Sequence, residues 1–337
     1  MTFHRHLTAA TAAFTLAFAL AGTTAEAQDF TGKTIKIIVG FSPGGGYDAY
    51  GRLLARHYGR QIDGKPTVIV QNMPGAGSMT AIRYLDAGGP KDGTAMTIFN
   101  PGLITQSLTE PKKAPIDFTK LRFIGSASSD IRLCYAWGKT GIKTMEDLLK
   151  RPQIVMGGTT SGSSAYVNGA LLRNMFGAKI KHVLGYPGSA EMRIAIERGE
   201  LDADCGAWGS TPQDWINGKK INMLVRFSKA SAPDMPSMPY IMEFAKTAEQ
   251  RQILNMILAP SEIGRPFVQT AKAPASALAG LRKAFMETVK DKAFLAEAAK
   301  GNREIIGPMS GEEAETAVRD IYATPKAVIG KVGAMIK

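Results

Sequence analysis

Three glycine-rich loops contain the residues best suited to bind a ligand. They span residues 42–46, 72–78 and 157–164, and each follows a short apolar segment. Glycine lacks a side chain, so a ligand can approach the backbone N–H groups closely there. A helix that begins after such a loop adds unpaired N–H groups and a partial positive charge, which attract phosphate or carboxylate. The loops therefore predict a site for a small anion, and tight strand-to-helix turns are the alternative.

Side chains beside the loops could complete such a site. The segment 159–164 offers several hydroxyl groups where a helix begins, more than one helix cap requires. Asp48 could cap the first helix, or it could orient waters and backbone groups around a ligand. Tyr186 and Trp208 could line a pocket or pack in the core. Arg265 could bind a carboxylate in a bidentate manner or form a surface salt bridge.

Groups suited to catalysis are scarce. Beyond the N-terminal leader described below, the histidines are His57 and His182, and no H-E-x-x-H or P-loop motif occurs. Residues 44–49 loosely match a dinucleotide-binding motif, but the next strand ends without the acidic residue that would bind a ribose. We therefore predict a protein that is not an enzyme and has no catalytic residues, metal or cofactor.

The loops are positioned by a regular alternation of strands and helices. Strands are predicted at 34–41, 67–70 and 95–99, and a loop and a helix follow each of the first two. Asn100 ends the third strand, so it joins the predicted site at the carboxyl edge where α/β sheets bind ligands. A second unit of this kind follows from about residue 123, and the C-terminal part is mostly helical. The pattern is typical of an α/β fold with mainly parallel sheets.

Composition and charge limit the kind of partner. The 337 residues are enough for about two domains, and 41 Lys and Arg against 29 Asp and Glu give a net charge of +12. The basic residues are scattered without long runs, so a nucleic-acid interface is not indicated. Either the charge forms a solvated basic surface, or it draws small anions to the protein.

Residues 1–27 have the features of a secretory signal peptide. Arg5 starts a short basic region, residues 7–20 form an uncharged apolar run, and residues 25–27 read Ala-Glu-Ala, a small-x-small cleavage signal. The run is shorter than the ~20 residues of a spanning helix. We predict cleavage before Gln28 and a periplasmic location, with an uncleaved anchor as the alternative.

The two cysteines, Cys134 and Cys205, would then reach an oxidising compartment. They could pair there, or they could be buried as small apolar residues. The sequence leaves both possibilities open.

The loop sequences resemble the solute-binding receptors of tripartite tricarboxylate transporters, the Bug receptors. Residues 37–45 read Ile-Ile-Val-Gly-Phe-Ser-Pro-Gly-Gly and are followed by Asp48, and residues 70–77 read Val-Gln-Asn-Met-Pro-Gly-Ala-Gly. Asp-Gly at 92–93, Gly-Ser-Ser at 162–164 and Tyr-Pro-Gly-Ser-Ala at 186–190 extend the similarity. It runs from about residue 33 to the C-terminus.

The resemblance implies a two-lobed periplasmic binding protein (type II-like), in which helices flank a mainly parallel sheet in each lobe and a cleft between the lobes takes the ligand. The first lobe would comprise residues 28–129 plus 251–337, and the second residues 130–250. One carboxylate end would be held through backbone groups and waters by residues of the first two loops: Phe41, Ser42, Pro43, Gly44, Gly45, Asp48, Pro74, Gly75, Ala76, Gly77 and Ser78. The second lobe would bind the rest of the ligand through Thr160, Ser161, Ser163, Ser164, Tyr186 and Ser189.

Three departures from the family pattern leave the distal ligand group unpredicted. Ser42 replaces a common proline, Gly206 stands where Asp or Asn is frequent, and about ten extra residues precede Arg265. The expected function is capture of a small organic carboxylate by a monomer that delivers it to membrane permease subunits. Mono-, di- and tricarboxylates and aromatic acids are the candidate ligands. The alternatives are an exported hydrolase or isomerase of small acids, and a ligand-sensing partner of a signalling receptor.

Overall fold

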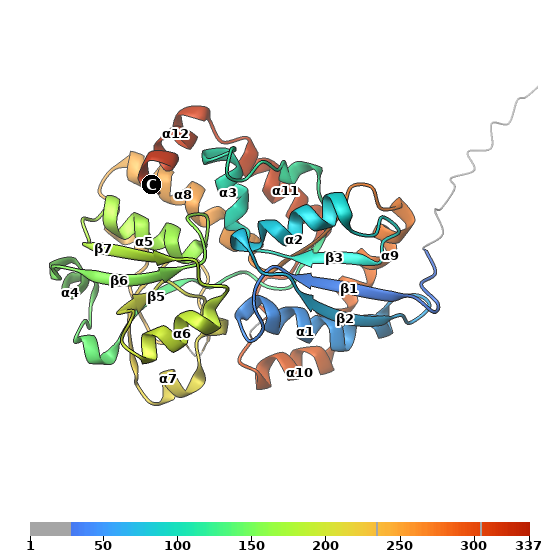
Figure 1. The fold of residues 1–337 in the computed structure, drawn as a ribbon, viewed down its shortest axis with the longest axis horizontal. Helices are drawn as coiled ribbons and strands as arrows, with labels where there is room; N and C mark the ends of the chain where they lie inside the picture. Colours follow the sequence, from blue (N-terminus) through green and yellow to red (C-terminus); the bar gives the residue numbers. More distant parts are fainter. Residues whose placement is uncertain (1–27, 234, 304) are drawn as a thin grey trace, which may run out of the picture.

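The computed structural model describes residues 28–337 except 234 and 304, and its strands form two sheets in two lobes (Figure 1). The predicted signal peptide and its cleavage site lie outside the described residues. Among those described, no helix is both long and apolar enough to cross a membrane.

The first sheet has six strands in the order β11-β4-β10-β3-β1-β2. Strand β1 is parallel to β2 and β3, whereas β10 is antiparallel to β3 and β4. The strands are β1 (Thr34–Val39), β2 (Thr67–Asn72), β3 (Ala95–Ile98), β4 (Arg122–Ser126), β10 (Pro266–Gln269) and β11 (Met309–Ser310). The helices that accompany this sheet along the chain are α1 (Gly46–Tyr58), α2 (Met79–Arg83), α3 (Gly102–Thr109), α9 (Ala275–Thr288), α10 (Lys292–Lys300) and α11 (Gly311–Tyr322).

The second sheet has five strands in the order β7-β6-β8-β5-β9. Strand β6 is parallel to β7 and β8, and β5 is antiparallel to β8 and β9. The strands are β5 (Leu133–Trp137), β6 (Ile154–Gly158), β7 (Ile180–Leu184), β8 (Ala203–Asp204) and β9 (Ile221–Arg226). The remaining helices are α4 (Met145–Lys150), α5 (Ser164–Asn174), α6 (Ser189–Glu197), α7 (Gln213–Asn217), α8 (Ala248–Ile263) and α12 (Lys326–Met335).

The α/β class and the two-lobed fold are confirmed, but both sheets are mixed rather than mainly parallel. The difference comes from β5 and β10, which enter their sheets directly from the other lobe. Each therefore starts at the edge where β1, β3 and β6 end, and it must run in the opposite direction.

Two segments, 127–131 and 261–265, connect the lobes side by side. The Ala127 N–H donates to the Arg265 carbonyl at 3.1 Å, and the Arg265 N–H donates to the Ser128 carbonyl at 2.9 Å. The Asp130 N–H donates to the Ser261 carbonyl at 2.8 Å. Because these bonds pair the two connections, any movement of one lobe against the other must bend both segments together.

The C-terminal helices contribute to both lobes. Ile253 and Ile257 of α8, with Val332 of α12, belong to the hydrophobic cluster of the second sheet, whereas Ile263 packs in a cluster of the first sheet. Figure 1 shows α8 and α12 above α5 and β7. The lobe boundaries at 129/130 and 250/251 stay a prediction.

Cys134 and Cys205 form a disulfide between β5 and the end of β8, so both possibilities left by the sequence apply: the cysteines are buried and paired. Their neighbours Tyr135 and Asp204 are directly opposite each other in the antiparallel pair. The bond therefore fixes β8 at the centre of the second sheet.

Replacing both cysteines with serine should lower the free energy of unfolding by about 2–4 kcal/mol, because the bond restricts the unfolded chain. Urea unfolding of the double variant Cys134→Ser, Cys205→Ser measures the loss. The oxidised wild type and the wild type treated with reductant are the controls. An unchanged midpoint at an unchanged slope would show that the disulfide adds no stability.

His182 of β7 makes stability depend on pH. Its ring lies 4.5 Å from the Tyr166 ring, and neither ring nitrogen has a hydrogen-bond partner. Burial, aided by the charge of Arg173, lowers the pKa of His182 to about 4. In the unfolded chain this histidine is protonated below about pH 6.5, whereas in the folded chain it is protonated only below about pH 4. The free energy of unfolding therefore falls as the pH falls from about 6.5 to about 4. His182→Gln should reduce this loss, which urea midpoints at about pH 7 and about pH 4.5 would measure. An equal loss in wild type and variant would contradict the assignment.

Candidate binding site

A small enclosed cavity of about 60 Å³ lies where the two lobes meet. Its lining combines a few apolar side chains with many hydroxyl, amide and charged groups. The lining residues are Phe41, Tyr47, Asn100, Arg132, Thr159, Ser163, Ser164, Ala165, Ser189, Met192, Asp204, Gly206, Ala207, Ser210 and Arg265. A larger groove of about 540 Å³ lies between α8, α11 and α12, but no buried unpaired polar atom lines it. The cavity between the lobes is therefore the better candidate site.

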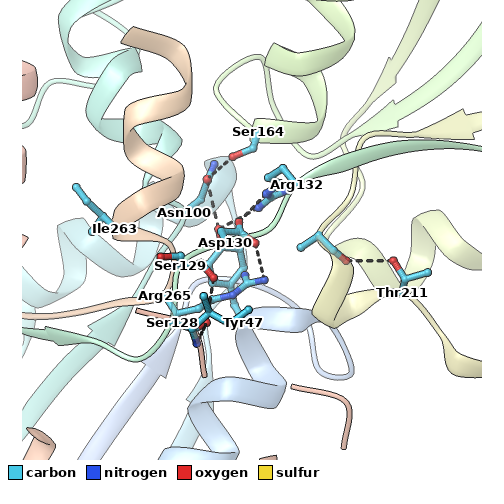
Figure 2. Close-up of polar contacts among 12 residues, drawn as sticks. Tyr47, Asn100, Ser128, Ser129, Asp130, Arg132, Ser164, Thr211, Ile263 and Arg265 are labelled. Atoms are coloured by element: carbon cyan, nitrogen blue, oxygen red, sulfur yellow. Dashed lines mark hydrogen bonds and ion pairs between the residues drawn. The ribbon is translucent and has the colours of Figure 1, made fainter. Parts of the chain in front are cut away.

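A buried ion cluster, shown in Figure 2, contributes two arginines to the lining of this cavity. The carboxylate of Asp130 accepts from Arg132 Nε at 2.6 Å and from Arg265 Nη2 at 2.9 Å. The side chains are 2%, 9% and 3% exposed, respectively. Burial acts to lower the pKa of Arg132, but the charge and hydrogen bond of Asp130, together with Tyr47 and Asp204, outweigh this and raise the pKa. Two guanidinium groups thus share one carboxylate, which leaves these three side chains with a net positive charge.

The Arg265 side chain is held in a fixed orientation. Its guanidinium lies over the rings of Tyr47 and Tyr50, 4.6 Å and 4.9 Å from their centroids. Tyr47 also stacks on Phe41 at 4.7 Å, which fixes the start of α1. Arg265 Nε is buried and has no hydrogen-bond partner. This N–H is therefore a donor that no group among the described residues satisfies.

Asn100, just after β3, connects the two lobes across the cavity. Its Oδ1 accepts from Ser164 Oγ at 3.0 Å and from the Gly102 N–H at 3.0 Å, and its Nδ2 donates to the Gly162 carbonyl at 3.2 Å. The Asn100 N–H in turn donates to Ser78 Oγ at 3.0 Å. The side chain thus helps to close the lobes and is itself positioned by the second loop.

Asp48 orders the first loop rather than lining the cavity. Its carboxylate accepts from the Gly44 N–H at 2.9 Å, from Arg52 Nε at 3.0 Å and from Asn72 Nδ2 at 2.8 Å. Burial raises the pKa of Asp48, but these three donors together outweigh it and lower the pKa. The first two loops are therefore joined through a buried carboxylate that stays ionised at neutral pH.

Further contacts between the lobes come from the first loop. Ser42 Oγ donates to Glu191 Oε2 at 2.9 Å, and Arg193 Nη2 donates to the Gly44 carbonyl at 2.9 Å. A Cβ atom at Gly77 would lie 2.7 Å from Thr160 Oγ1, so the second loop also touches the second lobe. Together with the Asn100 bonds, these contacts describe a closed arrangement.

Relatives of the sequence are distant. No protein-family model matches the chain. It is 25% identical over 340 residues to the UPF0065 protein in gbd 5'region of Cupriavidus necator. This alignment covers 96% of this chain and 95% of that relative. It is 26% identical over 243 residues to the UPF0065 protein in tcbD-tcbE intergenic region of Pseudomonas sp. strain P51, covering 69% and 70%.

Solved structures are similar over nearly the whole described chain. The periplasmic binding protein BugD superposes with a TM-score of 0.74 at 18% identity and covers 89% of this chain and 97% of its own. The chain has the Bug-receptor fold. A Rhodopseudomonas palustris protein with adipate gives a TM-score of 0.73 at 18% identity, covering 91% and 99%. MatC of the same organism, with bound malate, gives a TM-score of 0.71 at 15% identity and covers 90% of this chain and 99% of its own. The predicted resemblance to the Bug receptors is confirmed.

In this Bug-receptor fold, six of the predicted site residues line the cavity: Phe41, Asn100, Ser163, Ser164, Ser189 and Arg265. Arg265 is not on the surface, because its salt bridge is buried. The remaining predicted residues lie beside the cavity or farther away: Ser42, Pro43, Gly44, Gly45, Asp48, Pro74, Gly75, Ala76, Gly77, Ser78, Thr160, Ser161, Tyr186 and Trp208. Trp208 is 4% exposed and packs in the core of the second lobe. Ligand contact by any of these residues stays a prediction.

Thr159, from the hydroxyl-rich segment 159–164, also lines the cavity. Sequence analysis missed several other residues that this Bug-receptor fold brings there: Tyr47, Arg132, Ala165, Met192, Asp204, Gly206, Ala207 and Ser210. For two of them a signal was present. Arg132 lies between Ile131 and Leu133, and Asp204 lies between Ala203 and Cys205, so each is a charge inside an apolar strand segment. Such charges require a buried partner or a ligand.

Proposed function

We propose that this chain is a periplasmic solute-binding protein that encloses a small organic carboxylate between its lobes and delivers it to the membrane permease of a tripartite tricarboxylate transporter. The observation that carries the proposal is the buried cluster of Asp130, Arg132 and Arg265 at the cavity wall. Its two guanidinium groups suit a carboxylate, because guanidinium is the side chain best matched to that shape. Adipate and malate, the ligands named for two proteins of the same fold, are both carboxylates.

Capture and closure follow from the arrangement of the lobes. In an open state the carboxylate would first bind Arg132 and Arg265. These residues lie next to the two paired connections between the lobes, where closure would move the chain least. Closure would then add the hydroxyl groups of Ser163, Ser164 and Ser189 from the second lobe and exclude water. Removing water strengthens the attraction between the carboxylate and the guanidinium groups.

Binding without reaction is the expected chemistry. Of the two histidines described, His57 bonds to Glu297 at 2.6 Å and His182 lies in β7, and neither lines the cavity. We also propose that the protein is a monomer and that the signal peptide is removed before Gln28, which N-terminal sequencing of exported protein tests.

A thermal-shift panel of mono-, di- and tricarboxylates and aromatic acids tests the proposal. Binding to the folded state alone stabilises it by ~2.7 kcal/mol at a hundredfold excess over Kd. We expect a few carboxylates to raise the melting temperature and to be recovered unchanged. A flat panel would contradict the receptor function, and chemical conversion of a bound acid would favour the enzyme instead.

Gly46, the first residue of α1, provides a test of closure. A Cβ atom there would lie 2.2 Å from Ser210 Oγ, across the cavity, and 3.5 Å from Arg265 Nη2. Gly46→Leu should hold the lobes apart and weaken binding of the best acid from the panel by about tenfold or more, because closed molecules become rare. Calorimetric titration measures the affinity, with Gly330→Leu as the control, since nothing lies within 4 Å of a Cβ there. Equal affinities in the two variants would argue against closure around the ligand.

A further inference from the structure

Asp204 is a buried carboxylate with an unsatisfied oxygen at the cavity. It is 2% exposed, it ends β8, and it lines the cavity from the second lobe. Its Oδ2 accepts from the Tyr135 hydroxyl at 3.2 Å, whereas Oδ1 has no hydrogen-bond partner. A buried acceptor of this kind is costly unless a donor reaches it.

The position of Asp204 is fixed by its neighbours. Cys205 is bonded to Cys134, and Tyr135 stands opposite Asp204 in the paired strands. A Cβ atom at Gly206 would lie 2.8 Å from Asp204 Oδ2, so the glycine leaves the space that the carboxylate occupies. The side chain therefore cannot easily turn away to find another partner.

The same cavity contains an unsatisfied donor. Arg265 Nε is buried and unpartnered, and the residue lines the cavity from the first lobe. Thr159 Oγ1, also unpartnered, can serve as donor or acceptor. A ligand that pairs with both unsatisfied groups must offer an acceptor to Arg265 Nε and a donor to Asp204 Oδ1.

We infer that Asp204 is a specificity-determining residue, which selects carboxylic acids that carry a hydroxyl or amino group over the same acids without it. This inference rests on the proposed function, because the carboxylate of the ligand is assigned to the guanidinium groups. The hydroxyl or amino group then donates to Asp204 Oδ1. An unsubstituted acid would leave that oxygen buried and unpaired, and a site built for a polar group rejects an analogue that lacks it.

Matched sets of acids test the inference, for example succinate, malate and aspartate, with sets of other chain lengths, titrated calorimetrically into the purified protein. In one set at least, we expect the hydroxy or amino acid to bind about tenfold or more tightly than its parent acid. Comparing the two substituted acids shows which donor the site takes. Asp204→Ala should reduce this preference to about twofold or less and leave the parent acid bound.

The variants separate charge from shape. Asp204→Asn keeps the size and an acceptor oxygen but removes the charge. An ammonium group depends on that charge more than a hydroxyl group does, so the preference for the amino acid should fall more than the preference for the hydroxy acid. Asp202→Asn is the matched control, since Asp202 accepts from the Val155 N–H and does not line the cavity. Equal binding of parent and substituted acids by the wild type would overturn the inference but leave the proposed function standing. A preference that survives in Asp204→Ala would also overturn it, whereas no binding of any carboxylate would refute the proposed function.

Discussion

Asp130→Ala should lower the free energy of unfolding by about 3–5 kcal/mol, because removing one partner of a buried ion pair leaves uncompensated charge in the interior. Here the loss leaves two guanidinium groups, those of Arg132 and Arg265, buried without the carboxylate that bonds both of them. Their mutual repulsion acts at the junction of the lobes, where the Asp130 backbone also pairs with Ser261. We expect a clear fall of the urea midpoint.

Asp214→Ala is the matched control for this variant. Asp214 also forms an ion pair, with Lys220 at 2.7 Å, but its side chain is 63% exposed. Water screens such a pair, so its loss should scarcely change the midpoint. Equal small shifts in the two variants would mean that the buried cluster is not what stabilises the junction.

Arg265→Lys should weaken carboxylate binding about a hundredfold, although the charge is kept. Lysine lacks the Nε donor and the planar pair of N–H groups, so its ammonium group cannot reproduce the donor geometry that serves Asp130 and a ligand at once. Loss of one charged hydrogen bond in a buried site costs about 2–3 kcal/mol, and the remaining partner groups are left unpaired. Calorimetry with the best acid of the thermal-shift panel measures the change.

Arg282→Lys controls for the loss of a guanidinium elsewhere. Arg282 of α9 bonds Glu312 and Glu315 and is absent from the cavity lining. Its replacement should leave the affinity unchanged. Urea unfolding of both variants separates binding from stability. Unchanged affinity in Arg265→Lys would remove Arg265 from the site.

Local patterns in the sequence predict the elements of the fold well. The segments predicted as strands at 34–41, 67–70 and 95–99 contain β1, most of β2, and β3, because alternating or continuous apolar residues reflect burial on one or both faces. The glycine loops likewise fall between strands and helices. What these patterns omit is direction: whether a strand enters its sheet from the same lobe or from the other one depends on the path of the whole chain. The antiparallel placement of β5 and β10 was therefore not predicted.

The site could be predicted only in part for the same reason. Asn100, Ser163 and Ser164 follow strands, so their place at the carboxyl edges can be read locally. Asp130 and Arg265 are 135 residues apart, and they meet because the two connections pair. Asp204 faces the cavity only because β8 lies at the centre of the second sheet. Tertiary contacts of this kind leave only an indirect trace in the sequence, a charge within an apolar segment.

The central claim is that the cavity between the lobes binds a small carboxylate without changing it. Calorimetric titration of the purified protein with the acid selected by the panel, followed by chemical analysis of the recovered acid, tests it most directly. The account predicts one bound acid per chain, recovered intact, and a binding heat that Arg265→Lys largely abolishes. Saturable binding that is equally strong in Arg265→Lys, or recovery of a converted acid, would contradict it.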